Sequence, residues 1–316
     1  MTIPQFQRHI LAWYKDNRRD LPWRPNVRWR KGLPISPRAK RLAGNRSPAR
    51  PLAESWLPIS SKRLPQDLTP YHILVSEIML QQTQVPRVLQ KYPEFLHAFP
   101  TCTALARAPR QQLFSVWQGM GYWRRALYIQ ETARRIQKEY SGHVPSDLQN
   151  LRQLPGIGPY TAGAIACFAY QNTDAFIDIN IRRVYIKFFF IRKQNVEDGK
   201  ILRVAQKALW RPNPREWHYA LMDYGSLMLG KERTLNTQSA HYYKQTRFEG
   251  SPRFWRAHII RFLLAKGSLS RAALSRLMQK KAHEKGYPPP LLAPLLSSLQ
   301  KDGIVRVEKN GNFGIK

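Results

Sequence analysis

The sequence has few acidic residues for its size. Of its 316 residues, 20 are Asp or Glu and 52 are Lys or Arg, so the formal net charge is +32 at pH 7. A positive field of this strength is typical of proteins that bind a polyanion, above all nucleic acid; a ribosome-associated or merely soluble basic protein is the alternative. The 43% of hydrophobic and 11% of aromatic residues can build real cores, which excludes a disordered basic tail.

Cysteine is almost absent as well. Cys102 and Cys167 are the chain's two cysteines. Two thiols cannot on their own make a disulfide framework, a four-thiolate zinc site or an iron–sulfur cluster. We therefore expect buried, inert thiols in a reducing compartment, and no metal site.

Long apolar runs are also missing. No stretch approaches the roughly 18 apolar residues of a membrane span. Residues 1–20 have no apolar core behind a basic leader, so no secretory signal is expected. These features predict a protein with no membrane partner, which is cytoplasmic and nucleoid-associated if its source is bacterial or archaeal.

Helical periodicity covers most of the chain. Apolar residues recur at helical spacing, with proline and glycine at the joints, and strand alternation is nearly absent. The pattern predicts an all-α body of many short helices, in residues 1–24 plus 71–250. The expected helices lie within 1–20 (with Phe6, Ile10, Leu11 and Trp13 as apolar residues) and at 71–83, 85–98, 103–107, 110–118, 124–140, 147–153, 159–171, 179–191, 197–210 and 214–229.

Residues 25–70 interrupt this pattern. They hold eight of the chain's 24 prolines and ten basic residues, against the acids Glu54 and Asp67, and they show no regular periodicity. This composition predicts a flexible basic insertion that touches phosphates non-specifically. A passive loop or a gene-model artefact is the alternative.

Residues 251–316 differ again, because strand signals follow helical ones. Three helices and then a β-hairpin predict a winged-helix-like α/β module. From residue 253 onward the net charge is +10, which suits DNA contact by a helix in the major groove; a wing that docks another protein is the alternative. The expected elements are helices at 254–266 (closed by Gly267), 271–280 (capped by Ser270) and 290–300, and strands at 304–308 and 312–315 joined by Asn310-Gly311.

The segment LPGIGPYTAG (154–163) joins two expected helices through a Gly-x-Gly turn. Glycine lets backbone N–H groups approach a phosphate, and the N-terminus of the second helix presents a positive dipole to it. The motif resembles a helix-hairpin-helix, which grips the DNA backbone without reading sequence. A tight interhelical turn is the alternative; the helical body and the positive charge favour DNA binding.

Two carboxylates stand in apolar surroundings. Glu77 lies in SEIMLQQTQV (76–85), where burial would raise its pKa and keep it available as a proton donor; otherwise it is a solvated surface charge. Asp178 lies in FIDINIRRV (176–184) at the start of an expected helix, so it suits an N-cap, a role that does not exclude contact with a substrate. About a hundred residues separate the two, so their pairing is a prediction about the fold.

Five motifs of the chain occur in the same order as in the helix-hairpin-helix DNA glycosylases. They resemble most closely the motifs of the adenine DNA glycosylases of the MutY type. The segment LPWR (21–24) also matches that family's N-terminal motif. The resemblance covers residues 5–24 and 71–230 and implies the glycosylase fold with two helical subdomains. The motifs are SEIMLQQTQV (76–85), WQGMGYWRRA (117–126), LPGIGPYTAGAI (154–165), FIDINIRRV (176–184) and YALMDYGSLM (219–228).

The resemblance implies a base-excision-repair enzyme. Such an enzyme flips an adenine that is mispaired with guanine or 8-oxoguanine out of the duplex and cleaves its N-glycosidic bond. Glu77 matches the general acid that protonates the adenine, and Asp178 the carboxylate that stabilises the oxocarbenium-like sugar. The implied partner is duplex DNA with a mismatched adenine, bound by a monomer. Further matches are Tyr160 and Asn180, which support the two carboxylates; Trp23 and Arg24, in the adenine pocket; Gln82 and Tyr122, which enter the base stack; and Gly156, Gly158 and Thr161, in the DNA-binding hairpin.

The residue at position 160 separates subfamilies. Relatives of the endonuclease III type have a lysine there that attacks the sugar as an amine, so Tyr160 predicts a monofunctional glycosylase. A thymine or broad-specificity mismatch glycosylase of the same fold shares the tyrosine but lacks the QQTQV run, and ranks second. The third interpretation is a non-catalytic winged-helix DNA-binding protein, against which Glu77, Asp178 and Asn180 together argue.

The sequence departs from the family pattern in four places. No cysteine follows the 219–228 motif, where most relatives carry four, so no iron–sulfur cluster is expected; a monovalent cation at the hairpin is left open. The usual β-rich domain that detects 8-oxoguanine is replaced by the C-terminal module, so the resemblance does not extend to that preference. Ile179 stands where the family usually has glycine, and the 25–70 insertion separates Trp23 and Arg24 from the catalytic helix.

Overall fold

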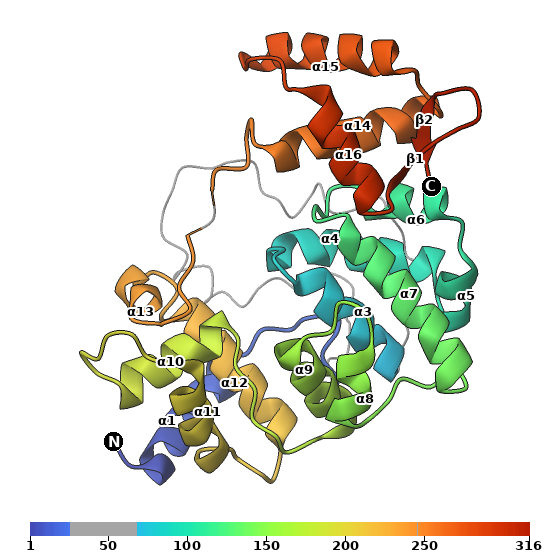
Figure 1. The fold of residues 1–316 in the computed structure, drawn as a ribbon. Helices are drawn as coiled ribbons and strands as arrows, with labels where there is room; N and C mark the ends of the chain where they lie inside the picture. The colour runs from blue at the N-terminus through green and yellow to red at the C-terminus, as the bar shows by residue number, and fades with distance from the viewer. Residues whose placement is uncertain (26–67, 245) are drawn as a thin grey trace. The chain divides into compact units, whose positions relative to one another are not determined.

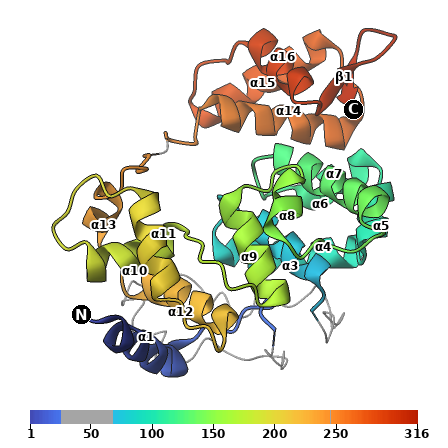
Figure 2. The ribbon, with the colours of Figure 1, turned by 60° about the horizontal axis from the view of Figure 1, so that its bottom comes forward.

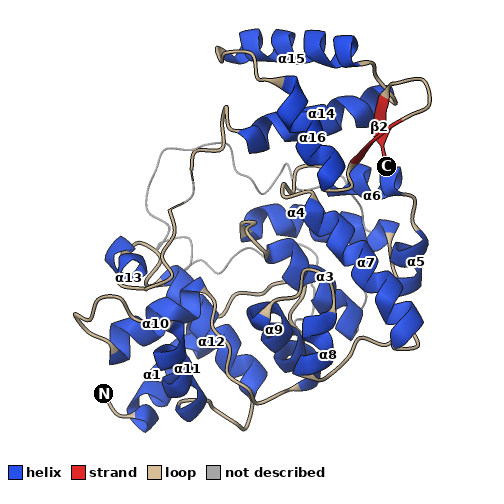
Figure 3. Ribbon diagram, viewed as in Figure 1, coloured by secondary structure: helices blue, strands red, loops and turns tan. Residues whose placement is uncertain are grey.

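The computed structural model describes residues 1–25 and 68–316, apart from residue 245 (Figure 1). The described residues form helices joined by turns, together with one two-stranded sheet near the C-terminus (Figure 3). The predicted all-α fold class is confirmed, whereas the predicted insertion at 25–70 lies outside the described residues except at its ends. Within 1–25 and 68–316, no helix is both long and apolar enough to span a bilayer.

The chain divides into two compact units, of which the first comprises Met1–Glu77 and Val144–Lys244. In this unit α12 packs against both α1 and α10 (Figure 1 and Figure 2). The three-part domain division expected from the sequence stays a prediction. The helices of this unit are α1 (Ile3–Asn17), α3 (Pro70–Leu80, whose last turn belongs to the second unit), α8 (Leu148–Gln153), α9 (Pro159–Tyr170), α10 (Ile179–Phe189), α11 (Asp198–Lys207), α12 (Pro214–Leu227) and α13 (Arg233–Thr237).

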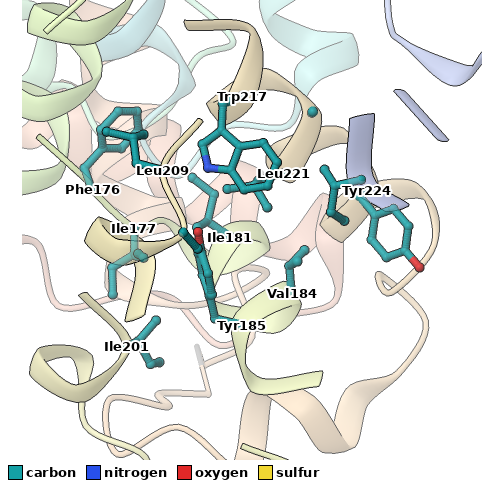
Figure 4. Close-up of a cluster of buried hydrophobic side chains, with 14 of the residues drawn as sticks. Phe176, Ile177, Ile181, Val184, Tyr185, Ile201, Leu209, Trp217, Leu221 and Tyr224 are labelled. Carbon is teal, nitrogen blue, oxygen red and sulfur yellow. The ribbon is translucent and has the colours of Figure 1, made fainter. Parts of the chain in front are cut away.

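The core of the first unit explains why the N-terminal helix forms. Thr2 begins α1 with a capping box. Phe6, Ile10 and Tyr14, spaced one helical turn apart, are buried, and the Phe6 ring packs edge-on against Trp217 of α12 with centroids 5.6 Å apart. Figure 4 shows the continuation of this core between α10, α11 and α12. Its labelled members include Phe176, Ile177, Ile181, Val184, Tyr185, Ile201, Leu209, Leu221 and Tyr224.

The second unit comprises Ile78–His143 and Gln245–Lys316. In it α7 packs along α5, while α6 contacts α4, α7 and α14. The segment expected to be helical over 71–83 ends at Leu80, three residues early, and its continuation turns at Gln82. The elements are α4 (Val85–Ala98), α5 (Cys102–Arg107), α6 (Arg110–Trp117), α7 (Arg124–Glu139), α14 (Pro252–Lys266), α15 (Arg271–Lys285), α16 (Leu292–Lys301), β1 (Val305–Val307) and β2 (Phe313–Ile315).

The C-terminal residues have the expected element order, with three helices followed by a hairpin. Gly267, with φ 77°, ends α14, and the Ser270 side chain caps α15. Helix α15 continues past residue 280 because Ala282 remains on its buried face, and it ends at the left-handed Gly286. We call residues 252–316 the C-terminal module; its winged-helix character stays a prediction.

The hairpin pairs β1 and β2 antiparallel, with Val305 opposite Ile315. The Glu308 N–H donates to the Asn312 carbonyl (2.8 Å), and of the turn residues only Gly311 has a left-handed φ, of 79°. The connection is therefore a three-residue loop with a glycine bulge, and not a two-residue Asn-Gly turn.

Gly225 of α12 lies directly against the backbone of α10. A Cβ atom at this position would come within 2.2 Å of the Asn180 carbonyl oxygen. We therefore expect Gly225→Ala to separate the two helices and to lower the free energy of unfolding by about 1–3 kcal/mol, measured by urea denaturation. Gly199→Ala in α11 is the matched control, because nothing lies within 4 Å of its Cβ position and alanine favours a helix. Equal losses in the two variants would contradict the close approach.

Candidate active site

Glu77 is a buried carboxyl in the apolar helix α3, with 2% of its surface exposed. Burial raises its pKa from an ordinary 4.5 to about 7. The alternative interpretation of Glu77 as a solvated surface charge is therefore wrong. A carboxyl that is about half protonated at neutral pH is suited to donate a proton to a substrate.

The fold brings Tyr160 and Asp178 to Glu77. Tyr160, in the first turn of α9, donates a hydrogen bond from its hydroxyl to Glu77 Oε2 over 3.2 Å. Burial is the main cause of the raised pKa of Glu77, and the negative charge of Asp178 raises it further. The two carboxyls therefore interact electrostatically. Burial, and then the charge of Glu77, raises the pKa of Tyr160 well above 10, which keeps the phenol protonated.

Asp178 is the N-cap of α10, as the sequence predicted for its structural role. Its Oδ1 accepts from the Ile181 N–H (2.7 Å), and its Oδ2 accepts from Asn180 Nδ2 (2.7 Å). Burial raises the pKa of Asp178, although both hydrogen bonds oppose the rise. The Asn180 Oδ1 accepts in turn from Arg183 (2.9 Å). Ile179, in place of the family's glycine, begins α10 and is 49% exposed, so the bulkier side chain is accommodated at the helix start.

Arg24 forms a buried ion pair that was not predicted from the sequence. Its Nη1 and Nη2 donate to the two carboxylate oxygens of Asp223 in α12, at 2.8 and 2.7 Å, and Arg19 adds two further bonds to the same carboxylate. The Arg24 guanidinium also lies over the Tyr219 ring, 4.3 Å from its centroid. Burial alone would raise the pKa of Asp223, but the charge and hydrogen bonds of Arg24 hold it below its usual value.

This ion pair ties the 18–25 segment to α12. Arg24 is 4% exposed, and its charge opposes the raised pKa of Glu77, so the two side chains interact. Trp23 is likewise buried. The signal for Asp223 lay in the motif YALMDYGSLM, where a lone acid stands one helical turn after Tyr219 in an apolar helix. Arg24 is therefore close enough to Glu77 for their charges to interact, although many residues separate it from α3 in the sequence.

The turn between α8 and α9 has the conformation expected of the hairpin motif. Gly156 adopts φ 76°, and Gly158 is the extended N-cap of α9, with nothing within 4 Å of a Cβ built on it. Thr161 is buried in the first turn of the helix. The open backbone at Gly158 and the positive helix end suit a phosphate, and phosphate binding there stays a prediction.

Gln82 and Tyr122 lie in two loops of the second unit that share one buried guanidinium. Both residues are left-handed, with φ of 56° and 45°, which is uncommon for side chains with a Cβ. Arg125 donates to the carbonyls of Met79 (2.9 Å) at the end of α3 and of Met120 (2.9 Å) in the other loop. Arg125 thus holds both loops together and satisfies carbonyls at the end of α3.

The residues present do not fit a four-thiolate iron–sulfur cluster, since the chain has two cysteines. Cys102 and Cys167 are both buried free thiols, and burial raises the pKa of each. In the described ranges, there is no group of three or more His, Cys, Asp or Glu side chains that could hold a metal ion. The segment after α12 is joined to the unit by ordinary hydrogen bonds, such as that of the Val196 N–H to the Gln238 carbonyl (2.8 Å).

The fold and the motif order agree with a known superfamily. Residues 75–212, which contain Glu77, Tyr160 and Asp178, match the model of the HhH-GPD superfamily of base excision DNA repair proteins. The chain carries a HhH-GPD domain. A solved structure of a thermostable thymine-DNA glycosylase matches this HhH-GPD fold with a TM-score of 0.57 and 21% identity, over 76% of this chain and 96% of that one.

Sequence relatives share most of this chain but extend beyond it. An adenine DNA glycosylase of Rattus norvegicus is 31% identical over 237 residues, which are 74% of this chain and 40% of the relative. An adenine DNA glycosylase of Mycolicibacterium smegmatis is 38% identical over 175 residues, 55% of this chain and 46% of the relative. The chain thus spans less than half the length of these curated relatives.

Proposed function

We propose that this HhH-GPD protein is a monofunctional DNA glycosylase that removes adenine mispaired with guanine or 8-oxoguanine. The observation that carries the proposal is the buried Glu77, with a pKa near 7, hydrogen-bonded to Tyr160 and coupled to Asp178. Relatives named adenine DNA glycosylase, at 31% and 38% identity, support adenine as the base.

In this mechanism the adenine leaves the duplex before its bond is broken, because a stacked nucleotide is out of reach. The protonated Glu77 donates its proton to the adenine ring. The N-glycosidic bond then breaks, and its electron pair leaves with the base. The Asp178 carboxylate stabilises the resulting oxocarbenium ion of the sugar. Water then adds to the sugar and gives one proton to the ionised Glu77, which leaves an abasic site and restores the acid form of Glu77.

Other residues of the first unit position these two groups. Tyr160 holds Glu77 through the 3.2 Å hydrogen bond, and Asn180 orients Asp178 through the bond to Oδ2. Because Tyr160 stands where a lysine would attack the sugar, no covalent imine forms and strand cleavage does not follow.

The hairpin at Gly156 and Gly158 grips the DNA backbone, and Gln82 and Tyr122 enter the base stack.

The decisive experiment measures base release from duplexes with A:G, A:8-oxoguanine, T:G and undamaged pairs, with abasic sites revealed by alkali. We expect adenine release from both A mismatches, at several salt concentrations because phosphate contacts make affinity salt-dependent. Release from T:G alone would instead indicate a thymine glycosylase, and binding without release of any base a non-catalytic protein.

Asp178→Asn tests the role of the second carboxylate in the same assay. Asparagine is as good an N-cap as aspartate, so α10 should keep its start while the negative charge is lost. We expect a fall in the single-turnover rate of at least about a hundredfold, because the oxocarbenium ion is no longer stabilised. An unchanged rate would refute the assigned mechanism.

A further inference from the structure

The C-terminal module contacts Tyr122, one of the residues assigned to the base stack. Arg253, in the first turn of α14, donates from Nη1 to the Tyr122 hydroxyl over 3.0 Å, and its guanidinium carbon lies 6.0 Å from the ring centroid. Arg125 approaches the same ring to 5.5 Å. Tyr122 is 39% exposed, so its ring lies beside two cations and still faces solvent.

The module is joined to α6 and α7 of the same unit by polar contacts. Arg110, at the start of α6, donates to the Gly303 carbonyl (2.9 Å). Asp302, which is 14% exposed on its side chain, pairs with Arg124 of α7 (3.6 Å) and with Arg256 of α14. These contacts, together with the packing of α14 on α6, hold the start of α14 beside Tyr122.

The second terminal nitrogen of the Arg253 guanidinium is also anchored. Its Nη2 donates to the Thr246 carbonyl (2.8 Å), which orients the guanidinium plane, while Nη1 reaches Tyr122. No salt bridge of Arg253 with a carboxylate occurs in the described part of the chain. A guanidinium with this fixed direction and no acidic partner suits a phosphate, which it can bind through two parallel hydrogen bonds.

We infer that the C-terminal module is part of the DNA-binding site, and that Arg253 binds a backbone phosphate of the duplex next to the base step that Tyr122 enters. The inference rests on the proposed function for the role of Tyr122. The module's net charge of +10 provides the attraction, and Arg253 provides the specific contact. The module would then take a direct part in engaging the mismatch, in addition to strengthening non-specific binding.

The test compares Arg253→Ala with Arg261→Ala in the full chain. Both variants remove one arginine from α14, but Arg261 is exposed further along the helix. The arginines that contact Tyr122 among the described residues are Arg253 and Arg125. Binding is measured with a duplex that contains an abasic-site analogue, which requires no base release. Because the salt slope changes by about 0.9 per phosphate contact, Arg253→Ala should lower its magnitude by about 1 and weaken binding about tenfold at 0.1 M salt. Arg261→Ala should leave both nearly unchanged.

A double-mutant cycle with Tyr122→Phe adds a second readout, because phenylalanine keeps the ring but cannot accept the hydrogen bond. The loss of affinity in the Arg253→Ala, Tyr122→Phe double variant should be smaller than the product of the two single losses. In the Arg261→Ala, Tyr122→Phe double variant, the loss should equal that product. Equal effects of the two arginine variants, or a multiplicative Arg253 cycle, would overturn the inference. If the wild type releases no adenine but the Arg253 effects appear, the proposed function fails and the module's DNA contact stands.

Discussion

Glu77→Gln is expected to abolish base release and, at the same time, to make the folded protein more stable at alkaline pH. Glutamine keeps the size of the side chain and can accept the Tyr160 hydrogen bond, but it has no acidic proton to transfer to the adenine. General acid catalysis typically contributes 10²- to 10⁴-fold, so the single-turnover rate should fall by about that factor. The wild-type rate should itself fall above pH 7, because the acid form of Glu77 is lost there.

The stability gain follows from the raised pKa. Folded Glu77 holds its proton up to about pH 7, whereas in the unfolded chain it loses it near pH 4.5. The folded state therefore binds more protons between these values, and the free energy of unfolding decreases as the pH rises through this window. One pKa unit corresponds to about 1.4 kcal/mol, so the wild type should lose about 3 kcal/mol between pH 4 and pH 9 through Glu77 alone. Glu77→Gln removes this loss.

Urea unfolding of both proteins at pH 5 and pH 9 measures the effect. Glu131→Gln is the control, because Glu131 is about half exposed in a surface pair with Arg134 and should alter neither stability nor rate by much. A Glu77→Gln protein that releases adenine at the wild-type rate would refute the general-acid role. One that is no more stable than the wild type at pH 9 would show that the carboxylate is not destabilising when buried.

Asp223→Ala should cost about 3–5 kcal/mol of unfolding free energy. The substitution leaves the Arg24 guanidinium buried with no opposite charge, and breaking one side of a buried pair carries a penalty of that size. Four hydrogen bonds from Arg19 and Arg24 are lost with it. Because those bonds tie the 18–25 segment to α12, we also expect faster limited proteolysis of the chain near residue 20.

Asp198→Ala provides the comparison for Asp223→Ala. Asp198 also accepts two hydrogen bonds from one arginine, Arg182, at 2.7 Å each, but this pair is 19% and 29% exposed. Water can replace the lost partner there, so a loss of about 1 kcal/mol or less is expected. If the two variants lose the same stability in urea, burial of the Arg24 pair is not the reason for its importance.

Most helices could be predicted from the sequence because their signals are local. Apolar residues at helical spacing marked the buried faces, as with Phe6 and Ile10 of α1, and caps such as Ser270 marked the starts. The end of α3 was predicted wrongly, since the QQTQ stretch has no glycine or proline to stop a helix. The helix ends where it does because the guanidinium of Arg125, from another helix, donates hydrogen bonds to the last carbonyls of α3.

The candidate site could be predicted in part. Its residue types were visible, and Asp178 was expected as an N-cap, which depends on its nearest neighbours in the chain. The burial of Glu77 and its hydrogen bond to Tyr160 depend on α9, which lies far away in the sequence. Asp223 was missed because an acid in an apolar helix shows no partner until Arg24 is placed beside it.

The sequence alone determined the basic charge, the helical composition and the order of the motifs, because these depend on residue type and short-range spacing. The packing of the helices shows which carboxyl is desolvated, which arginine is paired, and that the C-terminal module contacts Tyr122 through Arg253. Desolvation and ion pairing depend on distances between segments far apart in the chain. Such distances follow from how the helices pack, and no local pattern of residues encodes them.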